Sequence, residues 1–441
     1  MERHPAPERQ AMTYGELAET SWSWILQQVR WDDDGPWIPE FGGGGKPDEF
    51  VDSMHSGIGG LAYLLAELHL TRNLTQPEQD LANGIADRIR TRIPTTTSTT
   101  FFDGLVSSIG VLTALDQPGT SDILRRLETI ATGNGWPEAF LDEPRYAPGA
   151  VANDVTLGTG AILLGSLWAM RHAPEASKVA RELANRAVDL LLGEREELPT
   201  GVNWEFVSRR FRSDESTAMP NFSHGLAGIV AALAVAGVEL ERPELVDVAR
   251  RGAEHLVTLG VTNDRGFRVP RVIPWAERHG DEYTFNWCHG GAGTSLTFSA
   301  LEYADVPQIA GETPRTWHSR CLDGVRYSGI PERLHPGFWD NDGRCCGTAG
   351  VGDTFLDTWH RHRADQDLEF AVLMGDTLVH HAYPDGYWRF LEHTAPDPLL
   401  PPGVGWMQGA AGIAAYLFRL QRTLDGDPRP TPRMDNWWAV S

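Results

Sequence analysis

Two kinds of apolar segment alternate along the chain. In the first kind, such as HGLAGIVAAL from His224 and QGAAGIAAYLF from Gln408, apolar and small residues cover every side of the predicted helix. A helix that is apolar all round is buried, because it has no polar face to turn toward water. In the second kind, apolar residues recur every four positions on one face, as at Leu81, Ile85 and Ile89. Buried and amphipathic helices are therefore predicted to follow each other.

The amphipathic segments carry their own helix signals. Thr75-Gln76-Pro77-Glu78 is a capping box with proline in the first turn, directly ahead of one such segment. The same apolar spacing recurs in two later segments: Val179, Leu183, Ala187 and Leu191, then Leu245, Ala249, Gly252 and Leu256. Each of these segments predicts a helix with one face against the core.

A small-residue signature opens the buried segments and recurs seven times. The copies are SGIGGLAYLL from Ser56, VSSIGVLTAL from Val106, LGTGAILLGSL from Leu157, HGLAGIVAAL from His224, HGGAGTSLTF from His289, CGTAGVGDTFL from Cys346 and QGAAGIAAYLF from Gln408. The second copy has Ser107 where the first glycine stands elsewhere, and the third is out of register by one residue. A signature that returns at this interval indicates a repeat architecture.

Seven pairs of helices fit a closed ring, which makes the predicted fold all-α: an α/α toroid with seven inner and seven outer helices. An open solenoid is the alternative, but it would expose large end faces. We expect the toroid over residues 51–425. Residues 1–50 are predicted to form one helix and a glycine-rich lead-in, and residues 426–441 a tail packed by Trp437 and Trp438. The small residues are explained by close packing of the inner helices.

If the inner helices all run the same way, their N-termini meet at one end of the barrel. The residues just before the small-residue signature then line a shared mouth. These residues are Ser56, Asp154 with Leu157, His224, Cys288 with His289, Cys345 with Cys346, and Gln408. Helix N-termini carry partial positive charge, which stabilises thiolates.

Charge and composition exclude some functions. The 441 residues carry a net charge of −22, from 38 basic and 60 acidic residues, which argues against a nucleic-acid surface. The start of the chain lacks an apolar signal-peptide run, and the sequence has no uncharged apolar stretch long enough to cross a membrane. These features predict a soluble, cytoplasmic protein.

The four cysteines are Cys288, Cys321, Cys345 and Cys346. A chain of this length does not need disulfides, and adjacent cysteines pair poorly because bonded cysteines keep their Cα atoms more than about 4.4 Å apart. Metal binding or thiol chemistry remains, with inert buried cysteines as the alternative. Cys321 belongs to none of the motifs and is expected to be incidental, in a polar connecting segment.

Four motifs resemble those of the lanthionine synthetase C-like cyclases. They are NDVTLGTG at 153–160, SHGLAG at 223–228, WCHG at 287–290 and CCG at 345–347, within a sevenfold pattern over roughly residues 50 to 425. The resemblance implies a double α-barrel with one zinc ion at its mouth. It also implies the addition of a cysteine thiol of a precursor peptide to dehydroalanine or dehydrobutyrine, which closes a thioether ring.

The resemblance implies a ligand set as well. Cys288 and Cys345 match the first two zinc ligands of the family, and Cys346 matches the third, which is often histidine. Three thiolates donate more charge than two thiolates and an imidazole, so we expect a more nucleophilic and less discriminating substrate thiolate. A catalytic zinc site uses three protein ligands and one open position, which agrees with this count. His289 could also coordinate, but we expect it to support the site or face the substrate.

Addition of a thiol to a dehydroamino acid leaves an enolate that must be protonated, and histidine suits that step. His224 matches the family's catalytic histidine, and Asp154 matches its acidic partner, which could orient an imidazole or accept the thiol proton. Both residues could instead only cap their helices. Trp287, Trp406 and Gln408 are expected to face the substrate cavity.

Two further expectations concern histidines and a loop. His360, His362, His380 and His381 are predicted on helices away from the mouth, and the polar run 262–284 is predicted as a loop over the cavity.

The sequence therefore predicts a stand-alone cyclase with one zinc ion per chain and a dehydrated precursor peptide as its partner. The chain is too short to include the dehydratase or the kinase and lyase modules of some members, so a separate system would dehydrate the peptide. One alternative is an enzyme that adds glutathione to dehydroamino acids in damaged proteins. Another is a non-catalytic, zinc-containing peptide-binding scaffold.

Overall fold

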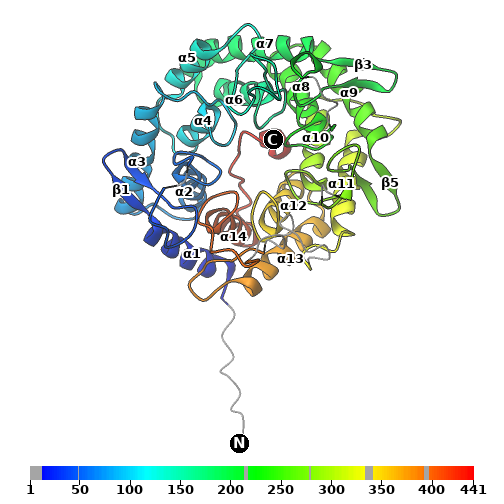
Figure 1. Ribbon diagram of the computed structural model, residues 1–441. Helices are drawn as coiled ribbons and strands as arrows, with labels where there is room; N and C mark the ends of the chain where they lie inside the picture. Colours follow the sequence, from blue (N-terminus) through cyan, green and yellow to red (C-terminus); the bar gives the residue numbers. More distant parts are fainter. Residues whose placement is uncertain (1–11, 48, 213–216, 278–279, 333–340, 392–396) are drawn as a thin grey trace, which may run out of the picture.

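The helices form a closed ring of two layers, seen along its axis in Figure 1. The computed structural model describes residues 12–47, 49–212, 217–277, 280–332, 341–391 and 397–441. The inner helices are α2 (Leu61–Thr71), α4 (Leu105–Ala114), α6 (Thr159–His172), α8 (Leu226–Glu239), α10 (Gly291–Tyr303), α12 (Thr348–His362) and α14 (Ala410–Leu424). The outer helices are α1 (Tyr14–Gln28), α3 (Gln76–Arg92), α5 (Thr120–Ile130), α7 (Ser177–Gly193), α9 (Pro243–Leu259), α11 (Pro314–Arg326) and α13 (Asp365–His381). The predicted α/α toroid is confirmed.

The ring closes where the first helix meets the last inner helix. A capping box of Thr13 and Glu16 begins α1, which packs against α14. The Tyr14 hydroxyl donates to Asp376 of α13 at 2.5 Å. This hydrogen bond joins the first outer helix, α1, to the last outer helix, α13. The single helix predicted within residues 1–50 therefore supplies one of the seven outer helices, and the open-solenoid alternative is wrong.

The two helix layers agree with the hydrophobic pattern. In α8, all residues from Leu226 to Gly237 are buried. The capping box of Thr75 and Glu78 does begin α3, whose Leu81, Ile85 and Ile89 face the core. Among the described residues, every helix falls short of the length and apolar character that a bilayer crossing requires.

Short elements complete the ring. Three antiparallel hairpins follow α1, α7 and α9: β1 (Arg30–Asp32) with β2 (Gly35–Trp37), β3 (Glu196–Leu198) with β4 (Gly201–Asn203), and β5 (Val261–Asn263) with β6 (Gly266–Arg268). The remaining elements are the 3₁₀ turns η1 (Ile58–Gly60), η2 (Pro174–Ala176) and η3 (Arg209–Phe211), and the last helix α15 (Trp437–Val440). None of the hairpins was predicted, because strands of three residues leave almost no periodic signal.

A glycine with extended backbone stands at the N-cap of each inner helix from α4 to α14, and in the first repeat at the N-cap of η1, which leads into α2. In α4 this residue is Gly104, so the mouth residue of the second repeat is Asp103. The predicted alignment on Ser107 is therefore wrong by three residues. The error arose because Ser107 is a small residue like those in the other copies.

The next glycine of the signature lets a mouth loop lie directly on the first turn of its helix. A Cβ atom added to Gly350 would lie 1.8 Å from the carbonyl oxygen of Arg344, and one added to Gly412 would lie 1.9 Å from that of Trp406. Backbone oxygens cannot move aside as a flexible side chain can. At these positions contact between loop and helix explains the signature, and not the predicted close packing of one inner helix against another.

We expect Gly412→Ala to lower the free energy of unfolding by about 1–3 kcal/mol, because the added methyl group overpacks a rigid backbone contact. Gly193→Ala, at the end of α7, is the matched control, since among the described residues no atom beyond its chain neighbours and its own helix backbone lies within 4 Å of its added Cβ. Chemical denaturation of both variants tests this expectation. Equal stability of the two variants would contradict it.

Candidate metal centre

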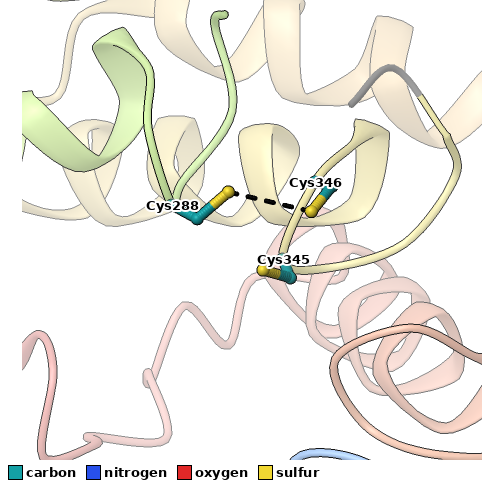
Figure 2. Close-up of side chains that lie close together, drawn as sticks. All are labelled: Cys288, Cys345 and Cys346. Carbon is teal, nitrogen blue, oxygen red and sulfur yellow. Dashed lines mark hydrogen bonds between the residues drawn. The ribbon is translucent and has the colours of Figure 1, made fainter. Parts of the chain in front are cut away.

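Three cysteine thiols meet at the mouth of the inner barrel. Cys288 precedes α10, whereas Cys345 and Cys346 precede α12. The three Sγ atoms all lie within 4.8 Å of one another, and those of Cys288 and Cys346 are 3.7 Å apart. Figure 2 shows these two sulfur atoms facing each other from separate loops. The predicted ligand set is therefore gathered in one place.

The donor set fits a zinc ion. Zn–S bonds of about 2.3 Å in a tetrahedron separate two sulfur atoms by about 3.8 Å, close to the observed 3.7 Å. Burial and the neighbouring thiols Cys345 and Cys346 raise the pKa of Cys288. A divalent cation would offset that cost, because a thiol that coordinates a metal ion loses its proton. The cluster is thus better suited to a cation than to three neutral thiols.

Two amides hold the cysteines in place. The Gln408 side chain donates from Nε2 to Cys346 Sγ at 3.1 Å. Asn286 Oδ1 accepts from Cys288 Sγ at 3.3 Å, and its Nδ2 donates to the Cys346 carbonyl at 3.4 Å. The sequence analysis missed Asn286. Its signal was the shared spacing in NFSHG and NWCHG, which places asparagine three residues before each mouth histidine.

Polar side chains cap the mouth loops in a repeated way. Asn221 Oδ1 accepts from the His224 backbone N–H at 3.1 Å, and Asn286 Oδ1 accepts from the His289 N–H at 3.3 Å. Asp154 Oδ1 does the same for the Leu157 N–H at 3.0 Å. Capping, one of the two interpretations of Asp154, is therefore present in the structure.

The second oxygen of Asp154 contacts His224. Asp154 Oδ2 lies 2.8 Å from His224 Nδ1, and the Asp154 carboxylate is fully buried while the His224 side chain keeps 30% exposure. The Thr156 hydroxyl, which the sequence analysis missed, lies 2.8 Å from Asp154 Oδ2 and 2.9 Å from His224 Nδ1. A hydrogen bond from Nδ1 to the carboxylate fixes the imidazole orientation and leaves Nε2 for other chemistry.

His289 connects this pair with the cysteines. It follows Cys288 in the chain, and its ring centroid lies 5.6 Å from that of His224. Burial, with the nearby His224 and Arg271, lowers the pKa of His289 to about 3, so its imidazole is neutral near pH 7. Arg271 belongs to the predicted loop 262–284, which therefore does reach the mouth.

The predicted substrate-facing residues divide into two groups. Trp287 and Trp406 are 7% and 3% exposed and pack from beneath the mouth, Trp287 against Phe222 and Trp406 against Tyr63. His289 and Gln408 keep partial exposure. The aromatic pair thus supports the mouth, whereas the polar pair is accessible.

A cavity of about 500 Å³ opens beside the cysteines. Its lining consists of Glu40, Phe41, His55, Ser56, Phe390, Leu400, Pro401, Gly403, Gly405 and Gln408. Because Gln408 lines the cavity and also donates to Cys346, the cavity adjoins the metal centre. Its walls are mostly apolar, with a few polar groups.

Two expectations from the sequence are wrong. Cys321 is fully buried on α11, not in a polar connecting segment, and burial raises the pKa of its thiol. His381 ends α13 near the mouth, where its Nδ1 lies 3.0 Å from Asp342 Oδ1, three residues before Cys345. Outer helices run opposite to inner ones, so the C-terminal end of α13 reaches the mouth loops.

Fold and site together define a helical toroid with a thiol-rich centre at one mouth. The model of the family "Lanthionine synthetase C-like protein" matches residues 49–427, and the chain belongs to that family. No curated protein is similar enough in sequence to match the chain.

Solved structures share the fold. Nisin cyclase is 14% identical with a TM-score of 0.58, over 92% of this chain and 93% of that chain. A GH76 α-mannanase from Bacteroides thetaiotaomicron is 11% identical with a TM-score of 0.50, over 94% and 98%. At these identities the likeness extends to the fold alone.

The double role of Asp154 predicts a graded loss of stability. Asp154→Ala leaves the Leu157 N–H without its buried acceptor, and we expect it to cost about 1–3 kcal/mol. Asp154→Asn keeps an oxygen for that bond and should cost less. Urea denaturation at one fixed zinc concentration compares the two variants. Equal losses would show that the cap contributes nothing to stability.

Proposed function

We propose that the protein is a lanthionine-forming cyclase that adds cysteine thiols of a dehydrated peptide to dehydroalanine or dehydrobutyrine. The observation that carries this proposal is the buried Asp154–His224 pair beside the three-cysteine cluster, with His289 between them. One mouth thus combines a site suited to a thiol with a group suited to proton transfer. The membership in the family supports the same reaction.

Cys288, Cys345 and Cys346 would hold one zinc ion per chain, whose chemistry is to lower the pKa of an incoming thiol toward neutrality. Three protein ligands leave a fourth position for the substrate. Gln408 and Asn286 orient the ligands through their hydrogen bonds to the sulfur atoms. Such supporting partners are needed for a well-ordered metal site.

His224 is proposed to carry the proton. In the reaction a C–S bond forms at the β-carbon, the π electrons move toward the carbonyl, and the α-carbon takes a proton. His224 Nε2 can accept the thiol proton and return one to the α-carbon, so that atoms and charges balance. Asp154 already accepts from Leu157 N–H and Thr156 besides His224, which favours orientation of the imidazole and stabilisation of its charged form over direct proton transfer.

The cavity beside Gln408 is proposed to receive the peptide. Its volume of about 500 Å³ and its Phe41, Phe390 and Leu400 walls suit apolar side chains near the reacting residues. The substrate must already contain dehydroamino acids. We propose that a separate dehydratase, or a kinase with a lyase, prepares it.

We expect purified protein to hold about one zinc ion per chain, and Cys345→Ala or Cys346→Ala to remove most of it. Cys346→His should preserve binding, because imidazole is also a zinc ligand. Elemental analysis measures the zinc content, with Cys321→Ala as the matched control that keeps it. Full zinc in Cys346→Ala would place the third ligand elsewhere, and His289 would be the first residue to test.

His224→Ala should keep its zinc yet close rings about 10²–10⁴-fold more slowly, the usual contribution of a positioned proton donor. Asp154→Asn should also keep zinc and slow the reaction, because a neutral amide no longer stabilises the charged imidazole. Ring closure changes no mass, so it is followed by alkylation of the remaining thiols of a dehydrated peptide and mass spectrometry.

The peptide alone gives the background rate for this assay. His69→Ala, in the last turn of α2 at the opposite end of the barrel, is the control and should react as the wild type does. An unchanged rate for His224→Ala would overturn its assignment. If the wild type only matched the background with peptides and with glutathione, the protein would be a scaffold.

A further inference from the structure

The C-terminal tail, residues 426–441, runs into the centre of the inner barrel. Figure 1 shows the C-terminus inside the ring. The Trp438 indole donates to the Leu296 carbonyl of α10 at 3.0 Å, and Arg361 of α12 donates to the Trp438 carbonyl at 2.6 Å. The Trp437 ring lies 5.7 Å from that of Trp168 on α6. The tail therefore contacts helices on different sides of the ring and fills its lumen.

The tail joins a buried cluster of charges on α12. Asp353 forms ion pairs with Arg344, with Arg419 at 2.6 Å and with Arg433 of the tail at 3.1 Å. Burial opposes ionisation, but the three guanidinium groups hold the pKa of Asp353 well below its usual range. Asp353 is therefore a buried carboxylate whose charge depends on its arginine partners.

A second acid extends this cluster. Asp357, one turn further along α12, pairs with Arg419 at 2.6 Å. It also accepts a hydrogen bond from Asn436 Nδ2 at 2.8 Å. The tail thus contacts both acidic side chains, through Arg433 and Asn436.

Arg344 connects this cluster with the metal centre. It directly precedes Cys345, and its guanidinium lies 4.6 Å from the Trp406 ring centroid. The backbone N–H groups of Arg344 and Cys345 both donate to the Met407 carbonyl, at 3.0 and 2.9 Å. Gln408, the next residue, donates to Cys346 Sγ. Arg344 thus connects the loop that contains Cys345 and Cys346 with the loop that contains Met407 and Gln408.

Little free space separates the tail from these loops. Trp287 and Met407 from the mouth, Arg344 and Asp353 from the charge cluster, and Arg433 and Asn436 from the tail line one cavity of only about 10 Å³. A displacement of the tail therefore cannot be absorbed by empty space and must move its neighbours.

We infer that the C-terminal tail positions the metal ligands, with Arg433 acting on Cys345 and Cys346 through Asp353 and Arg344. Arg433 and Arg344 are positioning residues, because neither belongs to the ligand set. Removal of Arg433 takes one positive charge from Asp353 and leaves Arg344 and Arg419 to compensate it, which shifts the loop attached to Arg344. The inference rests on the metal centre of the proposed function.

The test compares Arg433→Met with Arg422→Met in the full-length chain. Arg422 is equally buried and also reaches the tail, through the Arg429 carbonyl at 2.6 Å, but it pairs with Glu67 at 2.8 Å and not with Asp353. Zinc affinity is measured by competition with a chromogenic chelator. The thiolate-to-metal charge-transfer bands of the cobalt-substituted protein report the ligand geometry.

We expect Arg433→Met to lower zinc affinity by about 10–100-fold, as loss of a supporting partner does, and to shift the cobalt bands. Arg422→Met should lose thermal stability to a similar extent but keep both metal properties. Arg433→Lys, which keeps the charge, should restore most of the affinity. If Arg433→Met does not fold, Arg433→Gln compared with Arg422→Gln decides in the same way, because glutamine also removes the charge.

The outcomes separate this inference from the proposal on which it rests. If the wild type binds zinc and the two methionine variants bind it equally well, the positioning role is overturned and the metal centre stands. If the wild type binds neither zinc nor cobalt, the metal centre and the positioning role both fail.

Discussion

The contact between each mouth loop and the first turn of the helix behind it determines where the functional groups lie. At Gly350 and Gly412 the loop backbone comes closer than any side chain would allow. The residue just before each N-cap glycine is therefore held at the rim of the barrel. Repetition of this contact around the ring gathers His224, His289 and Cys346, residues far apart in the sequence, at one mouth.

The same polar groups cap the mouth loops and contact the residues of the candidate site. Asp154 caps a mouth loop with one oxygen and contacts His224 with the other, and Asn286 caps its own loop while it accepts from Cys288. Burial makes these hydrogen bonds costly to lose, so they hold the side chains of the candidate site in one arrangement. The three thiols lie within 4.8 Å of one another, and this donor set suits a cation.

The toroid itself does not specify the reaction. A GH76 α-mannanase shares the fold at a TM-score of 0.50, so the ring hosts unrelated chemistry elsewhere. What distinguishes this chain is the content of its mouth and lumen. A ring of seven inner helices encloses a central space that must be filled, and here the chain's own C-terminal tail fills it with tryptophans and paired charges.

Local spacing in the sequence determined much of this protein. The alternation of buried and amphipathic helices, the seven repeats and the cysteines before two of them depend on neighbouring residues, and each could be predicted. Ser107 misled the alignment of one repeat, because small residues resemble one another without their backbone context. Only the tertiary structure decided that α1 closes the ring, that Thr156 contacts His224, that Cys321 is buried and that Arg433 reaches Asp353. Those contacts join residues tens to hundreds of positions apart, and their partners are selected by packing around a closed ring, which no local pattern records.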